Sequence, residues 1–275
     1  MKSKLPVKKS KEEIAFYIEN GPKFGNVLHT LYDGITNGKL HNGIEIENKF
    51  FSLVGGVDNK AWALDAMFPF SYEKNYLGHM FICGICVSVN DVIAHGRPTE
   101  EPFKKGDVVS VDCGLSLSFD HGRLHFDSAF TASFGTEPLD WILKPHEALV
   151  NIHKEQAKNT HRVAEIISST ANSFGLDTVV MLTGHGIGYS LHEKPTIRNA
   201  PGKYSNEHFF EGLCFCAEPI FVQQNMGNGL ARAYVDSDGW SIKTINSQPG
   251  SHFETMFCIH NKKLIDICGI TNWFC

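Results

Sequence analysis

One segment, residues 106–135, constrains the fold of this chain more than any other. Apolar and small polar residues alternate over 108–118, which is the pattern of a β-strand. A second β-rich run follows residues 120–122, a cluster of turn residues that can close an antiparallel hairpin. We therefore predict a hairpin whose turn brings Asp112 opposite Asp127.

The two aspartates of this hairpin have two interpretations. Side chains directly opposite each other have Cβ atoms about 4.5–5.5 Å apart, and two like charges there are destabilising. Either the register differs by two residues and both carboxylates face water, as most aspartates do, or the carboxylates converge on divalent cations. Oxygen ligands suit hard metals, and a metal reverses the local charge balance. The hairpin alone leaves both interpretations open.

Composition indicates a globular protein. The 275 residues, 42% hydrophobic and 20% charged, suffice for one sizeable core. The net charge of −5 provides no basic field for nucleic acid, so we expect no specific nucleic-acid partner. No apolar run has the length of a membrane span, and the lysine-rich start lacks an apolar signal core. We therefore expect a cytoplasmic protein without a membrane partner.

The eight cysteines are too few for a disulfide scaffold, so we expect reduced thiols. Cys83 with Cys86, and Cys214 with Cys216, have the close spacing of pairs that bind zinc through four thiolates. Both pairs lie in apolar, β-rich segments, where a free cysteine packs as a small hydrophobic residue. Packing is the preferred interpretation, with a thiolate zinc site as the alternative.

The pattern of the remaining chain is that of an α+β protein. Residues 1–9 are expected to form a flexible basic tail. A capping box then begins an amphipathic helix over 11–36, although Gly21-Pro22 would equally fit two shorter helices in line. Helical spacing returns over about 147–171 as two helices, the second ending at Gly175. Strand-like runs follow at 178–183, 213–222 and 252–260.

Further polar residues stand in β-rich surroundings. His185 lies among three glycines that let the backbone approach a ligand, although their spacing and the following Pro195 do not fit a dinucleotide-binding loop. Glu218 and Glu254 lie at the ends of apolar strands, and a carboxylate there is costly unless it is paired or metal-bound. Together with the two aspartates, these residues suit two hard or borderline divalent ions better than one zinc ion.

These motifs, in this order, resemble those of the methionine aminopeptidases of the shorter, bacterial-type (type I) class in the M24 metallopeptidase family. The matching segments are SVNDVIAHGRP (88–98), GDVVSVD (106–112), HFDS (125–128), GHGIG with HEKP (184–195), AEP (217–219), DGWSIKT (238–244) and HFET (252–255). The similarity extends from about residue 10 to residue 270 and is weak only over 37–80.

The resemblance implies the pita-bread fold, in which two pseudo-symmetric α+β halves surround a dinuclear metal site. The halves here would be about 10–136 and 137–275, forming one catalytic domain. The implied activity is removal of the initiator methionine from nascent polypeptides with a small second residue, by attack of a metal-bridging water on the first peptide bond. The implied cofactors are two divalent ions of cobalt, manganese, iron or zinc.

The resemblance also implies a role for individual residues. Asp112 would bind one metal, Asp127 and Glu254 would bridge both, and His185 and Glu218 would complete the other. The catalytic residues would be His95, His192 and Glu218. The two histidines would contact the scissile peptide, and the substrate's first side chain would be lined by Phe81, Cys86, Leu191 and Trp240.

The chain departs from the family in four places. The hairpin between Asp112 and Asp127 is a few residues longer than usual. Residues 82–85 replace a usual proline and polar residues, and His252 replaces a commoner glutamine. Leu191 is smaller than the usual residue, which predicts spare room beside the substrate methionine. The absence of a long helical insertion between His185 and Glu218 argues against the type II class.

Two other functions are compatible with the pita-bread fold. An Xaa-Pro peptidase shares the fold, but the separate N-terminal domain expected of it is not seen. A non-catalytic pita-bread protein that binds ribosomes or nucleic acid would be expected to lack metal ligands, whereas all five are present. We expect a monomer that acts on the N-termini of nascent chains. The lysines of residues 1–9 offer a means of steering it to the acidic ribosome surface, with a plain solvated tail as the alternative.

Overall fold

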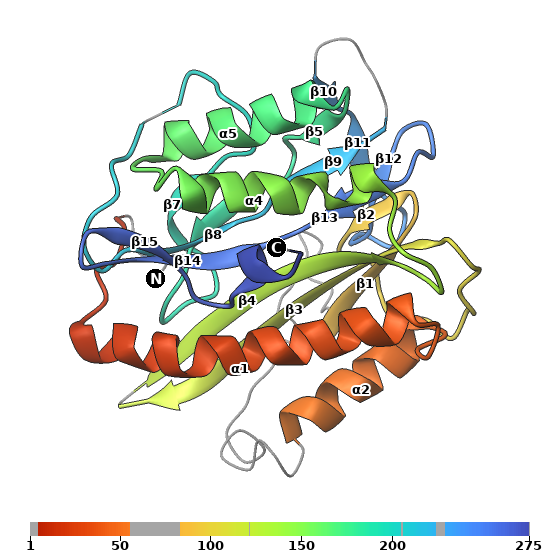
Figure 1. Ribbon diagram of the computed structural model, residues 1–275, viewed down its shortest axis with the longest axis horizontal. Coiled ribbons are helices and arrows are strands. Elements are labelled where there is room, and N and C mark those ends of the chain that lie inside the picture. Colours follow the sequence, from red (N-terminus) through yellow and green to blue (C-terminus); the bar gives the residue numbers. More distant parts are fainter. Residues whose placement is uncertain (1–4, 56–82, 121, 205, 224–228, 275) are drawn as a thin grey trace.

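The computed structural model describes residues 5–55, 83–120, 122–204, 206–223 and 229–274. Helices form the two outer sides, and strands lie between them (Figure 1). The first part of the chain contains α1 (Lys11–Thr36), α2 (Gly43–Gly55), β1 (Ile85–Val89), β2 (Val92–Ala94), β3 (Val108–Phe119) and β4 (Gly122–Ser133). The second part contains η3 (Asp140–Leu143), α4 (Lys144–Lys154), α5 (Thr160–Ser173), β5 (Asp177–Val179), β6 (Gly184–Gly186), β7 (Glu193–Ile197), β8 (Cys214–Ala217), β9 (Ile220–Val222), β10 (Leu230–Ala231), β11 (Ala233–Val235), β12 (Ile242–Thr244), β13 (Gly250–His252), β14 (Thr255–His260), β15 (Lys263–Asp266) and η4 (Ile270–Asn272).

Helix α1 is one continuous helix that passes through Pro22, so the alternative of two short helices is wrong. The predicted capping box is confirmed, because the N–H of Glu13 donates to the Ser10 hydroxyl at 3.1 Å and the Ser10 N–H donates back to the Glu13 carboxylate. Gly21 lets the C-terminal segment approach the helix closely. A Cβ at this position would lie 2.2 Å from the carbonyl oxygen of Ile267.

The end of the expected N-terminal tail is part of the folded structure. Lys8 forms an isolated β-bridge with Leu213, and the N–H of Lys9 donates to the carbonyl of Gly212 at 2.7 Å. The Lys9 side chain is fully buried against Glu193, which supplies its counter-charge. The expectation of a solvated tail is therefore wrong for Lys9, which also cannot contribute to any steering of the protein.

The hairpin of β3 and β4 is confirmed, but its predicted register is wrong by two residues. Asp112 lies opposite Ala129, and Asp127 lies opposite Gly114. The cause is the position of the turn: Phe119 pairs with Gly122, whereas the predicted register needs a turn centred one residue earlier, near Phe119 and Asp120. The two aspartates are diagonal neighbours on one face of the hairpin, where side chains remain within reach of each other.

Both faces of the hairpin are buried except near its tip, where Ser118 is exposed. Helix α1 packs on the hairpin at β4, and β13 and β14 pack against it from the second part of the chain. The small polar residues that alternate along the hairpin therefore face the protein interior rather than water. Ser110 and Thr131, for example, form a buried hydroxyl–hydroxyl hydrogen bond of 2.9 Å. This geometry places the aspartates between the two parts of the molecule.

The second part of the chain contains a sheet with the order β15-β14-β8-β6-β7 and another with the order β10-β5-β9-β13. Helices α4 and α5 cover these strands, as predicted, and Gly175 follows α5 with a left-handed φ of 66°. The predicted strands are shorter than expected. The run 178–183 keeps a strand only to Val179, and the other two runs divide into β8 with β9 and into β13 with β14.

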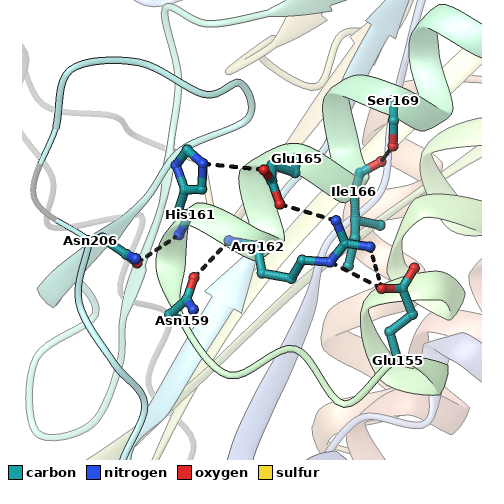
Figure 2. A network of polar contacts seen from close by, with 8 residues as sticks. All are labelled: Glu155, Asn159, His161, Arg162, Glu165, Ile166, Ser169 and Asn206. Atoms are coloured by element: carbon teal, nitrogen blue, oxygen red, sulfur yellow. Dashed lines mark hydrogen bonds and ion pairs between the residues drawn. The ribbon is translucent and has the colours of Figure 1, made fainter.

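The two helices of this part are tied together at their junction by polar contacts (Figure 2). The Asn159 side chain caps α5 by accepting from the N–H of Arg162 at 2.8 Å. The Arg162 guanidinium contacts Glu155 after α4 and Glu165 on α5. These pairs are half exposed, and each contributes little to stability. No helix within the described ranges is long and apolar enough to cross a membrane.

Candidate metal centre

Three carboxylates gather between the hairpin and the second part of the chain. Asp112 comes from β3, Asp127 comes from β4, and Glu254 lies in the link between β13 and β14. One oxygen of each lies within 4.8 Å of the other two. Of the two interpretations of the hairpin aspartates, convergence is therefore the one that the structure supports, although the two residues are not directly opposite.

Backbone contacts hold Glu254 against the hairpin. Its N–H donates to the carbonyl of Ala129 at 2.9 Å, and its carbonyl accepts from the N–H of Ala129 at 3.2 Å. The Ser128 hydroxyl also donates to this carbonyl, at 2.6 Å. Because Ala129 is the residue opposite Asp112, these bonds bring the Glu254 side chain beside both aspartates.

Glu218 and Glu254 interrupt two neighbouring strands at the same level. Strand β8 pairs with β14, and β9 pairs with β13, in one antiparallel register that continues across both interruptions. This register places Glu218 opposite Glu254, and it explains why the two predicted runs divide there. Burial is the main cause that raises the pKa of both Asp127 and Glu254, and the charge of Glu218 raises both pKa values further.

His185, in the middle of β6, faces the same cluster. Its Nε2 lies 3.7 Å from an oxygen of Asp127 and 3.9 Å from an oxygen of Glu254. Its Nδ1 lies 3.0 Å from the carbonyl oxygen of Gly186. Since a carbonyl only accepts, Nδ1 carries the proton and Nε2 presents a lone pair to the carboxylates, which is the arrangement of a metal-binding histidine.

The carboxylates fit a bound cation. One oxygen each of Asp112, Asp127 and Glu254 is buried without a hydrogen-bond partner in the part of the chain that the structure describes. Buried polar atoms are rarely left unpaired, and buried charges are paired or bind metals. Divalent ions would satisfy these oxygens and offset the repulsion between the carboxylates. The donor set of carboxylates and imidazole suits hard or borderline ions.

The raised pKa values predict how pH affects the metal-free protein. Burial raises the pKa of Asp112 to about 7, and burial together with the charge of Asp112 raises that of Glu218 to about 8. Groups with a raised folded-state pKa contribute stability that is complete below their unfolded values and is lost as pH rises through the folded values.

We therefore expect the melting temperature of the metal-free protein to fall as pH rises from about 6.5 to about 8, a range above the unfolded-state pKa of histidine, and metal affinity to rise over the same range. Thermal unfolding at several pH values, with chelator and with added metal, measures both effects. A melting temperature of the chelated protein that is constant or rises with pH would contradict the assignment.

Both predicted catalytic histidines lie near this cluster. The His192 ring is exposed and stands edge-on to the His185 ring, with centroids 4.4 Å apart. His95 follows β2 with a left-handed φ of 55°, a strained conformation that is common at functional sites. Burial, and then the proximity of His192, lower the pKa of His95 to about 4. His95 is therefore a neutral imidazole near pH 7, able to donate one hydrogen bond and accept another.

Two further residues at the cluster had no predicted role there. Cys216 lies with His185 and Glu254, one ligand atom of each being within 4.8 Å of the others. His252 is buried, and both its ring nitrogens lack a hydrogen-bond partner among the described residues. Burial and nearby His95 lower the pKa of His252 to about 3. The only sequence signal for His252 is its replacement of a commoner glutamine.

The alternative of a four-thiolate zinc site is not supported. Cys86 lies opposite Asp112, whereas Cys214 lies opposite Cys258 with the sulfurs 3.1 Å apart. Neither group of clustered ligand atoms in the described residues includes Cys83, Cys86 or Cys214. Burial raises the pKa of Cys86, Cys214 and Cys216 well above the usual value, so these remain neutral thiols.

The glycine-rich segment at His185 is followed by β7 rather than by a helix, which excludes a dinucleotide-binding loop there.

The residues predicted around the substrate's first side chain are only partly described. Cys86 and Leu191 are buried members of the main apolar cluster, and Trp240 packs against that cluster. Cys86 is also directly opposite Asp112, beside the carboxylates. Phe81 lies outside the described residues.

Buried carboxylates and an imidazole, enclosed between two layers of helices and strands, define a metal-dependent enzyme. The chain belongs to the metallopeptidase family M24, whose model matches residues 36–261. A methionine aminopeptidase of Mycoplasma capricolum is 33% identical over 187 residues, 66% of this chain and 70% of that protein. A methionine aminopeptidase of Aquifex aeolicus is 30% identical over 200 residues, 70% of this chain and 74% of that protein.

Solved structures agree with the sequence relatives. The crystal structure of a methionine aminopeptidase from Thermotoga maritima superposes with a TM-score of 0.79 at 25% identity, covering 96% of this chain and 99% of that chain. The predicted resemblance and the α+β pita-bread fold are thereby confirmed.

Proposed function

We propose that this chain is a methionyl aminopeptidase, which removes the N-terminal methionine from nascent polypeptides and peptides with a small second residue. The observation that carries the proposal is the convergence of Asp112, Asp127, His185 and Glu254 in a fold shared along nearly its whole length with a methionine aminopeptidase. The names of its relatives support the substrate class.

The proposed cofactors are two divalent ions held by Asp112, Asp127, His185, Glu218 and Glu254. When bound, such ions acidify a water so that it becomes a nucleophile near neutral pH, and they polarise the carbonyl of the scissile peptide bond. Reconstituting metal-free protein separately with manganese, iron, cobalt or zinc, with metal analysis of each sample, identifies the number and kind of ions.

The side chains of the protein would handle the substrate and its protons. Neutral His95 would donate a hydrogen bond to the scissile peptide, and exposed His192, whose ring contacts that of His185, would contact the reacting carbonyl group. Glu218, which lies opposite Glu254 at the cluster, would accept a proton at its carboxylate and return it to the leaving amine.

Hydrolysis of the tripeptide Met-Ala-Ser tests the proposed function. Chelator-treated protein should release no methionine, and reconstituted protein should release it and leave Ala-Ser. No release with any of the four ions would refute the proposal. Cleavage of an Xaa-Pro dipeptide instead would identify the rival peptidase activity, and metal-independent binding without hydrolysis would identify a non-catalytic protein.

The small side chain of Leu191 predicts relaxed selectivity for the substrate's first residue. We expect measurable cleavage of Leu-Ala-Ser, with Met-Ala-Ser preferred, because one methylene in an apolar pocket discriminates by only about 1–3 kcal/mol. Leu191→Phe should narrow the pocket and raise the preference for methionine. The ratio of kcat/KM for the two peptides is compared in both proteins. An unchanged ratio in the variant would show that Leu191 does not line the pocket.

A further inference from the structure

A lysine from the N-terminal segment reaches the loop that carries His192. The Lys9 side chain is 0% exposed, and its Nζ lies 2.8 Å from Oε2 of Glu193, whose side chain is 6% exposed. The same Nζ donates to the carbonyl of Val7 at 3.1 Å. A buried charge is strongly unfavourable without its partner. The two residues are 184 positions apart in the chain, so this ion pair is a long-range tie between the N-terminal segment and the loop.

The other oxygen of Glu193 holds the loop itself. The N–H of Ser190 donates to Oε1 of Glu193 at 3.1 Å, and the N–H of Gly188 donates to the Ser190 carbonyl at 3.1 Å. The Gly188 carbonyl accepts from the backbone N–H of His125 at 2.9 Å and lies 3.0 Å from its ring Nδ1. The loop is thus closed on itself, attached to β4 on one side and to Lys9 on the other.

The lysine also occupies the space that a side chain at position 188 would need. A Cβ on Gly188 would lie 2.1 Å from Cε and 2.3 Å from Nζ of Lys9. A side chain at position 188 would therefore displace the end of the Lys9 side chain, which is buried against the loop rather than lying along the protein surface. His192 directly precedes Glu193, and its ring stands against that of His185.

We propose that Lys9 is a positioning residue that, through Glu193, holds His192 at the reacting group. The proposal rests on the proposed function for the reaction in which His192 takes part. Displacing a catalytic group by about 1 Å can lower a rate about 100-fold. The N-terminal segment thereby becomes part of the support of the active site, and removing residues 1–9 should impair hydrolysis of even a tripeptide.

Lys9→Met tests this role, with Lys8→Met as the matched control, because Lys8 is the exposed neighbour on the same segment. We expect the kcat of Lys9→Met on Met-Ala-Ser to fall about 10- to 100-fold, with metal content and KM close to those of the unaltered protein. In a His192→Ala background, Lys9→Met should cause no further loss, because its effect passes through His192. An unchanged kcat, or an equal loss in both backgrounds, would overturn the proposal.

The double variant Lys9→Met/Glu193→Gln separates positioning from stability. It leaves no unpaired buried charge, so its melting temperature should recover relative to Lys9→Met, while kcat stays low. Recovery of kcat together with stability would show a merely structural ion pair. If Lys9→Met alone does not fold, the double variant takes its place. Its kcat is then compared in the presence and absence of His192→Ala.

A spectroscopic measurement distinguishes failure of this proposal from failure of the proposed function. The ring signal of His192 in protein with isotope-labelled histidine is assigned by its loss in His192→Ala. Lys9→Met should shift or broaden this signal, and Lys8→Met should not. An unmoved signal overturns the positioning role even if methionine release is confirmed. A moved signal supports it even if the substrate proves to be a different peptide.

Discussion

Replacing Glu254 with alanine is expected to remove bound metal and abolish hydrolysis. One oxygen of its carboxylate lies within 4.8 Å of Asp112 and Asp127, and its Oε1 lies 3.9 Å from Nε2 of His185, so its loss would leave the proposed ions under-coordinated. Changing a residue that only supports a metal ligand costs about 10- to 100-fold in affinity or activity, and losing the proposed shared ligand should exceed this. Asp127→Ala should behave in the same way. Metal analysis of the purified variants and assays of Met-Ala-Ser hydrolysis measure the effects.

A stability measurement shows whether Glu254 is a ligand or a structural residue. In metal-free protein, burial is the main cause that raises the pKa of Glu254. Repulsion from the other carboxylates raises that pKa further. The isosteric Glu254→Gln should therefore be at least as stable as the unaltered protein when both lack metal, and should gain less from added metal. Glu165→Ala, at an exposed ion pair on α5, is the control and should keep both metal and activity. Two ions retained per chain in Glu254→Ala would refute the assignment.

Replacing either His95 or His192 with alanine is expected to stop turnover while metal is retained. Loss of a group that donates or accepts a proton in the transition state lowers kcat about 10²- to 10⁴-fold. His185→Ala should instead lose metal affinity, because its Nε2 faces Asp127 and Glu254. Metal content and kcat of the three variants, measured side by side, give the comparison. Identical behaviour of all three would show that the division between ligands and catalytic groups is wrong.

Much of the local structure follows from the sequence. The hairpin, the helix over 11–36 with its capping box, and the helices α4 and α5 are all predicted from apolar spacing and turn residues, and all are confirmed. These features depend on interactions within one segment, where the periods of helix and strand are visible in consecutive residues. The carboxylates and histidines can likewise be singled out as candidate site residues, because a polar or charged residue in an apolar segment is costly to bury unless it is paired or binds a metal.

Register and strand ends depend on contacts that the local pattern does not contain. The alternation of the hairpin is the same whether Asp112 faces Asp127 or Ala129, and the turn decides between them. The predicted run 213–222 reads as continuous, yet it divides at Glu218 because the partner strand divides at Glu254. Pro22 would end many helices, but α1 continues through it where the C-terminal segment packs close to Gly21.

The sequence by itself therefore determined the α+β class, through short-range periodicity, and the family, through the resemblance of motifs that each lie within a single segment. Only the tertiary structure decided which side chains meet. The burial of Lys9 against Glu193, and the approach of Cys216 to His185, join residues from different strands and loops. A run of lysines has the same local pattern whether its side chains are solvated or paired. Whether one of them is buried depends on where the folded chain places an opposite charge.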